Sequence, residues 1–76
     1  MPHIQLKLFA TLTRYAPKKA EQFPIEAGTS IETLVRELEI PVEMVKLIFI
    51  NGRKGLMTSS LEGGERVGLF PPVGGG

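Results

Sequence analysis

One apolar stripe of helical period, flanked by segments that alternate like strands, constrains the fold of this chain most strongly. The stripe follows the i, i+3, i+4, i+7 spacing of a single helix face and consists of Ile31, Leu34, Val35 and Leu38. With 76 residues the chain is the size of one small domain. A lone helix must bury its apolar face against a sheet. The sequence therefore predicts an α+β domain with one main helix packed on one face of a mixed sheet.

Five strands are expected around this helix, in the order β-β-α-β-β-β. Apolar and polar residues alternate from Ile4 to Leu8, which is the period of a strand with one buried face. Pro24 places the second strand at an edge, because proline cannot donate a ladder hydrogen bond. The Asn51-Gly52 dipeptide favours a tight hairpin turn. The expected strands span residues 4–9, 21–26, 45–50, 53–57 and 66–70.

Local signals mark the ends of the helix and the loops. Thr29 and Glu32 have the spacing of a capping box, which predicts that the helix begins there. Pro41 should end the helix by about residue 40, because the residue before a proline disfavours helical angles. Residues 11–20 and 58–60 are expected to be loops, with Leu61 as an isolated apolar anchor and residues 62–65 as a turn.

Composition excludes several classes of site. The chain has no cysteine, so a disulfide, a thiolate metal site and a thiol nucleophile are excluded. A net charge of +1 with scattered basic residues predicts no nucleic-acid partner. The eight carboxylates and the single histidine, His3, show no metal-ligand spacing, so we expect no metal. No apolar run approaches the ~20 residues of a membrane span. A cytoplasmic protein without a permanently bound cofactor or a catalytic group of its own is expected.

Two aromatic residues are candidates for a partner interface. By alternation, Phe9 and Phe70 lie on the outward side of the first and last strands, at the end of each. If these strands are parallel neighbours, the two rings meet where the chain leaves the sheet. An exposed aromatic pair at that place would suit protein docking. In the alternative interpretation, one or both rings fold over the sheet edge and are partly buried.

Residues 71–76 are expected to form a flexible tail behind a domain of residues 1–70. Pro71 and Pro72 impose a stiff, extended exit that cannot continue a central strand. Glycines have no side chain, so Gly74, Gly75 and Gly76 can thread a backbone carboxylate into a narrow cleft. The six residues reach at most about 20 Å. In the alternative interpretation, they are a frayed end without function.

Together these motifs resemble the MoaD/ThiS family of sulfur carriers, which have the ubiquitin-like β-grasp fold. The resemblance covers essentially the whole chain. Its sharpest match is the stem Phe70-Pro71-Pro72-Val73 followed by a terminal Gly-Gly, which is closer to the molybdopterin synthase small subunits than to the thiamin carriers. The other landmarks are residues 9–10, 28–31, 51–52 and 61–67.

The resemblance implies a function for the tail. An E1-like adenylating enzyme would use ATP to activate the carboxylate of Gly76, and a sulfur donor such as a cysteine desulfurase or a rhodanese-type protein would convert it to a thiocarboxylate. The tail, including Val73, Gly74 and Gly75, would then thread into the molybdopterin synthase large subunit, where sulfur passes to a pterin precursor. Phe9 and Phe70 would belong to the surface shared with these partners.

Three alternatives share the fold. The chain could carry sulfur for thiamin or another sulfur pathway, or it could be a protein modifier conjugated to lysines through Gly76. It could also be a plain β-grasp interaction module with an inert tail.

Overall fold

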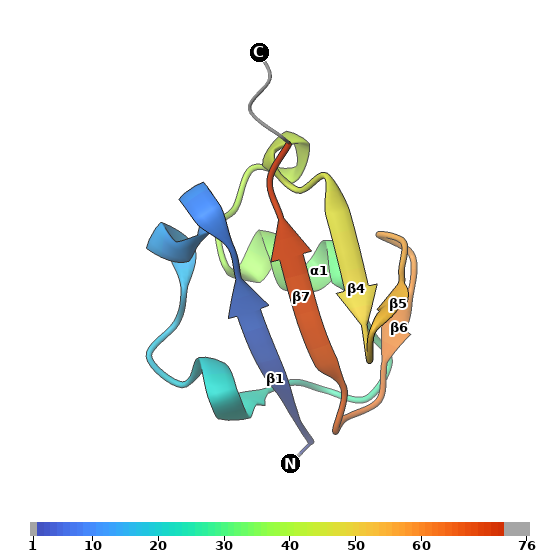
Figure 1. Ribbon diagram of the computed structural model, residues 1–76. Coiled ribbons are helices and arrows are strands. Elements are labelled where there is room, and N and C mark those ends of the chain that lie inside the picture. The colour runs from blue at the N-terminus through green and yellow to red at the C-terminus, as the bar shows by residue number, and fades with distance from the viewer. Residues whose placement is uncertain (1, 73–76) are drawn as a thin grey trace.

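The structure is a computed structural model that describes residues 2–72, so the expectations for Val73, Gly74, Gly75 and Gly76 lie outside the described residues. Figure 1 shows the arrangement of its helices and strands. The elements are β1 (His3–Leu8), the 3-10 helices η1 (Ala10–Tyr15) and η2 (Ala20–Gln22), β2 (Phe23–Pro24), β3 (Thr29–Ser30), α1 (Ile31–Glu37), η3 (Val42–Met44), β4 (Leu47–Ile50), β5 (Arg53–Lys54), β6 (Ser60–Leu61) and β7 (Arg66–Phe70).

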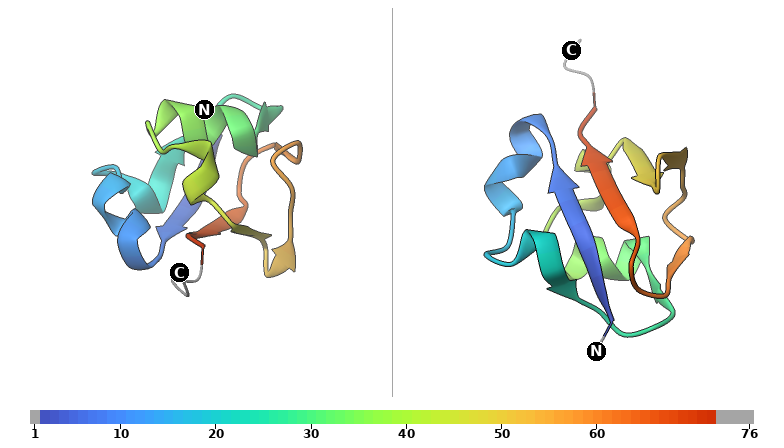
Figure 2. Two further views of the ribbon diagram at one scale, coloured as in Figure 1. Left: turned by 90° about the horizontal axis from the view of Figure 1, so that it is seen from above. Right: turned by 60° about the horizontal axis from the view of Figure 1, so that its bottom comes forward.

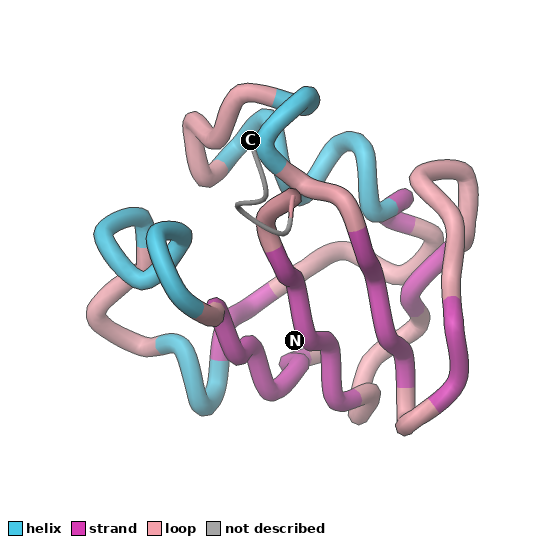
Figure 3. The backbone as a smooth tube through the Cα atoms, turned by 45° about the horizontal axis from the view of Figure 1, so that its top comes forward, coloured by secondary structure: helices cyan, strands magenta, loops and turns pink. Residues whose placement is uncertain are grey.

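The main sheet has the strand order β2-β1-β7-β4-β5. The central pair, β1 and β7, is parallel, and the other pairs are antiparallel. Figure 3 shows its longer strands side by side, and the left view of Figure 2 shows α1 on one side of them. The α+β fold with one main helix on a mixed sheet is confirmed. The opposite face of the sheet is not covered by α1.

The core lies between α1 and the sheet, as the two periodicities predict. The alternation along β1 buries Ile4 and Leu6, and that along β7 buries Val67 and Leu69. Removing these side chains from water stabilises the domain by roughly 1.5–3 kcal/mol each. The helix contributes the matching layer, and the residues of the core are Ile4, Leu6, Leu12, Ile25, Ile31, Leu34, Val35, Ile40, Val45, Ile48, Leu61, Val67 and Leu69.

Several expected segments are shorter than predicted, or differ in type. The expected strand over 21–26 is wrong except at Phe23–Pro24, although Pro24 does lie in the outermost strand, β2. Of the strand over 53–57, only Arg53–Lys54 pairs. Residues 10–15 form η1 instead of a loop. Ser60–Leu61 pairs with Thr29–Ser30, so the anchor Leu61 belongs to a second, two-stranded sheet.

The helix cap is Ser30, and the predicted capping box of Thr29 is wrong. The Ser30 hydroxyl accepts a hydrogen bond from the Thr33 N–H at 3.1 Å. Thr29 instead lies in β3, and its hydroxyl donates to the carbonyl of Glu26 at 2.6 Å. The Glu32 carboxylate instead accepts a hydrogen bond from the Arg36 guanidinium at 3.0 Å, in the expected i, i+4 ion pair. The cap therefore lies one residue after the predicted position.

The helix ends at Glu37, before the predicted limit, through a Schellman motif. The Ile40 N–H donates to the Val35 carbonyl, and the Glu39 N–H donates to the Arg36 carbonyl. This closure requires the left-handed conformation at Glu39, whose φ is +61°. A residue with a Cβ is strained by about 1–2 kcal/mol in that conformation.

Replacing Glu39 by glycine is expected to stabilise the protein. Glycine adopts positive φ without the Cβ clash, and its greater freedom in the unfolded chain cancels part of the gain, which leaves about 0.5–1 kcal/mol. Urea unfolding followed by circular dichroism would measure the change. The matched control is Glu37→Gly, at the last residue of α1 with helical conformation, which should destabilise the protein by up to about 1 kcal/mol. Equal effects of both variants would contradict the prediction.

Candidate functional site

The candidate site is the face of the main sheet opposite α1, called here the open face. Pairing register places side chains on it in cross-strand rows, because facing residues of neighbouring strands share a face. One row runs from Lys7 of β1 through Gly68 of β7 and Phe49 of β4 to Lys54 of β5. The neighbouring row toward the end of β7 includes Phe70 and, facing it on β4, Leu47.

The two predicted aromatic residues do meet on this face. The Phe9 and Phe70 rings are stacked, with centroids 4.1 Å apart and planes inclined by 2°. The parallel pairing of β1 with β7 brings them together, as predicted. Phe9 is 37% exposed, and Phe70 is half-buried. Both interpretations of the pair hold in part, because Phe9 is exposed while Phe70 is partly covered.

A third ring, Phe49, completes the aromatic cluster and was missed from the sequence. It makes an edge-to-face contact with Phe70, with centroids 5.7 Å apart and planes at 82°. The run 45–50 is almost entirely apolar, so it showed no alternation that would place Phe49 outward. The Asn51-Gly52 hairpin turn was the signal in the sequence that could have placed Phe49 on this face. With Asn51 and Gly52 both at positive φ, the turn fixes Phe49 opposite Lys54.

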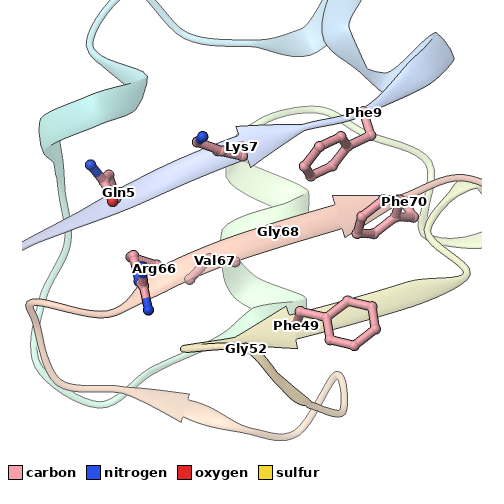
Figure 4. Close-up of a pocket in the computed structure, with 9 residues that line it drawn as sticks. All are labelled: Gln5, Lys7, Phe9, Phe49, Gly52, Arg66, Val67, Gly68 and Phe70. Carbon is pink, nitrogen blue, oxygen red and sulfur yellow. The ribbon is translucent and has the colours of Figure 1, made fainter.

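A groove of about 390 Å³ lies among these rings and the charged residues beside them. Gly68 forms its floor, and a Cβ there would lie 3.4 Å from the Phe9 ring and 3.8 Å from the Phe70 ring. Figure 4 shows the rings at one end of the groove and Gln5 and Arg66 at the other. The lining residues are Gln5, Lys7, Phe9, Phe49, Gly52, Arg66, Val67, Gly68 and Phe70.

Backbone hydrogen bonds on both sides fix the position of Phe9. Its N–H donates to the Leu69 carbonyl at 3.2 Å, and its carbonyl accepts from the Leu12 N–H at 3.0 Å. The next residue, Ala10, has a φ of +52°, which turns the chain from β1 into η1. Because the backbone of Phe9 is fixed and its ring stacks on Phe70, the side chain loses little conformational entropy when a partner covers it.

The end of β7 fixes the root of the tail. The Phe70 carbonyl accepts a hydrogen bond from the Lys46 N–H at 2.8 Å. β7 ends at Phe70, as predicted from the prolines, with Pro71 half-buried and Pro72 exposed. The described chain therefore leaves the sheet next to the stacked rings, at the end of the molecule opposite the N-terminus (Figure 1).

Within residues 2–72 no cluster of three or more histidine or acidic side chains could hold a metal ion. His3 is exposed at the start of β1. None of the helices in the same part of the chain is long and apolar enough to cross a membrane.

The carboxylate of Glu65 holds the turn before β7. Partial burial raises the pKa of this carboxyl, but hydrogen bonds from the backbone N–H groups of Glu62, Gly63 and Glu65 itself outweigh the burial and hold the pKa below its ordinary value. The Glu62 and Gly63 bonds measure 2.8 and 2.7 Å. The turn also binds the first strand, since the Gly64 N–H donates to the His3 carbonyl.

Acid is expected to remove the stability that Glu65 contributes. A lowered pKa in the folded state stabilises the protein above the unfolded pKa, and this contribution disappears as the pH falls below about 4. Glu65→Gln should cost about 1–2 kcal/mol at neutral pH and little in acid. Thermal unfolding across pH would measure this. Glu62→Gln, at an exposed neighbour, is the control, and a constant difference between Glu65→Gln and the unmutated protein at every pH would contradict the expectation.

Solved structures with similar folds come from archaea. The HVO 2177 protein of Haloferax volcanii has a TM-score of 0.77 and 23% identity, covering 99% of this chain and 87% of that chain. The small archaeal modifier protein 1 of the same organism has a TM-score of 0.73 and 18% identity, covering 96% and 100%. A protein from Pyrococcus furiosus assigned as molybdopterin converting factor subunit 1 has a TM-score of 0.68 and 23% identity, again covering 96% and 100%.

No curated protein sequence matches this chain significantly. The model of the ThiS family, however, matches residues 6–76, which include all of β7 and the second half of β1. The similarity to solved structures confirms the ubiquitin-like β-grasp fold. This chain belongs to the ThiS family of small, ubiquitin-like sulfur carriers.

Proposed function

We propose that this protein carries sulfur for molybdopterin synthesis as the small subunit of a cytosolic molybdopterin synthase. The observation that supports this function best is the position of the stacked Phe9–Phe70 pair, 4.1 Å apart, directly where the chain leaves β7. A partner that covers these rings also holds the root of the tail. The tail itself, with its Pro71-Pro72 stem and Gly76 end, resembles that of the synthase small subunits.

The proposed chemistry takes place at the Gly76 carboxylate and uses enzymes of other chains. A carboxylate is a poor electrophile, so an E1-like enzyme first lets its oxygen attack the α-phosphorus of ATP, releasing pyrophosphate. The terminal sulfur of a persulfide on a desulfurase or rhodanese-type donor then attacks the acyl carbon, and AMP leaves. A thiol then attacks the donor's cysteine sulfur in the acyl disulfide, so that a new disulfide forms and the thiocarboxylate is released. The resulting thiocarboxylate gives its sulfur to a pterin precursor in the large subunit. The carrier contributes positioning, and the partners contribute the catalytic groups.

The test is reconstitution with the E1-like enzyme and sulfur donor of the same genome. Mass spectrometry should detect an exchange of one oxygen for sulfur at Gly76. Addition of the large subunit and a pterin precursor should then consume the thiocarboxylate and form the dithiolene product. Persistent absence of sulfur at Gly76, with both proteins active on a known carrier, would contradict the proposal.

Two alternative functions have separate supporting observations. The family name points to thiamin synthesis, and in that case the thiazole-forming enzyme, rather than the synthase large subunit, should consume the thiocarboxylate. The similarity in fold to a small archaeal modifier protein supports conjugation. Conjugation through Gly76 predicts lysines of other proteins that carry residues 67–76 after tryptic digestion, because Arg66 is the last site for trypsin in this sequence.

A further inference from the structure

The open face carries both aromatic rings and cationic side chains. The rings lie toward the tail, and beside them lie three exposed cations, Lys7, Lys54 and Arg66. Register places Lys7 and Lys54 in one row, with Gly68 and Phe49 between them. Arg66 faces Gln5 in the adjacent row. The groove over Gly68 therefore has rings at one end, Lys7 at its side and Arg66 at its other end, and Lys54 lies next to Phe49 outside the groove.

Among the described residues, none that lines this groove is acidic. Within residues 2–72 the only ion pair joins Arg36 to Glu32 on α1, so the three cations of the open face have no carboxylate partner there. Acidic side chains lie on the helix side, at Glu32 and Glu37. The whole chain has a net charge of only +1, so the cations on this face are a local feature and do not reflect an excess of basic residues in the chain.

We propose that the open face binds an acidic protein surface. An aliphatic or aromatic side chain of the partner occupies the groove over Gly68, between Phe9 and Phe49, and neighbouring carboxylates of the partner pair with Lys7, Lys54 and Arg66. This inference rests on the proposed function, since the partners are the E1-like enzyme and the synthase large subunit. It adds the chemical character of the surface that each must present.

The aromatic rings and the cations of the open face affect binding in different ways. The rings supply most of the affinity when the partner covers them, because hot spots concentrate in apolar, desolvated centres. The exposed cations act mainly on the rate of association and on its dependence on salt. Protein is a better match than nucleic acid, because three cations neutralise few phosphates and the Phe9 and Phe70 rings already stack on each other.

Charge reversal tests the inference with a matched control. In Lys7→Glu/Arg66→Glu the association rate constant for each purified partner of the same genome should fall about tenfold at low salt, and its salt dependence should weaken. Lys18→Glu/Lys19→Glu makes the same change of net charge in the exposed loop between η1 and η2, outside the groove. This control should change the rate less than threefold. Surface plasmon resonance at several salt concentrations measures both.

Folding and chemistry are checked on the same samples. Circular dichroism verifies that each variant is folded, and Lys7→Gln serves as the milder variant, with a smaller reduction of the association rate expected.

Equal association rates for the two double variants, or no change in either, would overturn the inference. So would tight binding of a single-stranded RNA oligonucleotide that Lys7→Glu/Arg66→Glu abolishes. If the unmutated protein gains sulfur at Gly76 and only the charge effects are missing, the inference alone fails. If it neither binds nor gains sulfur, the proposed function fails with it.

Discussion

One residue added after Gly76 should abolish sulfur transfer and leave the domain folded. The added residue converts the Gly76 carboxylate to an amide, which cannot attack ATP, and moves the new carboxylate about 3.5 Å further from the root of the tail. Misplacement of a reacting group by 1 Å can already cost about 100-fold in rate, so the loss here should be at least that large. The measurement is the rate of thiocarboxylate formation at the C-terminus in the reconstituted system.

The matched control adds the same residue before Met1, because the first strand starts at the opposite end of the molecule (Figure 1). This variant should transfer sulfur at the unmodified rate. Both variants should unfold at the same temperature as the parent, since neither addition touches the core between α1 and the sheet. Full activity of the C-terminally extended chain would refute a mechanism that depends on a free carboxylate at Gly76.

The parts of the fold that were predicted from the sequence are those with a strong local pattern. The 3.6-residue spacing of Ile31, Leu34, Val35 and Leu38 predicted the buried face of α1. The first three are fully buried, and Leu38 follows the end of the helix and is half-buried. Alternation along β1 and β7 predicted their inward and outward sides. The meeting of Phe9 and Phe70 was predicted only on the condition that these strands are parallel neighbours, and the structure fulfils that condition.

The parts that were missed depend on contacts between distant residues. The pairing of Thr29–Ser30 with Ser60–Leu61 has no local signal, because two residues are too few to show a period. The helix cap also depends on a contact that the pattern did not show, since the Thr29 hydroxyl donates to the Glu26 carbonyl and the Ser30 hydroxyl accepts from Thr33. The aromatic site was predicted only in part for the same reason. Phe49 lies in a run without alternation, and its outward direction follows from the hairpin register.

Truncating the exposed ring of the pair should weaken partner binding far more than it weakens the fold. Phe9→Ala removes a ring that is 37% exposed and lies on the border of the groove. An aromatic anchor at the centre of an interface typically contributes 2 kcal/mol or more, so the Kd for the synthase large subunit should rise about 30-fold. The loss of stability should be about 1 kcal/mol, because the ring already contacts water in the unbound protein.

Leu56→Ala is the control for this prediction, since Leu56 is more exposed, at 66%, but lies outside the groove. Its Kd should change less than about twofold. Phe70→Ala is less informative, because Phe70 also contacts Phe49 and its loss would disturb the whole cluster. Isothermal titration calorimetry with the large subunit and with the E1-like enzyme gives both affinities. If folded Phe9→Ala bound both partners with unchanged affinity, the aromatic pair would have no role in docking. The position of Phe9 beside the tail would then result from packing within the domain alone.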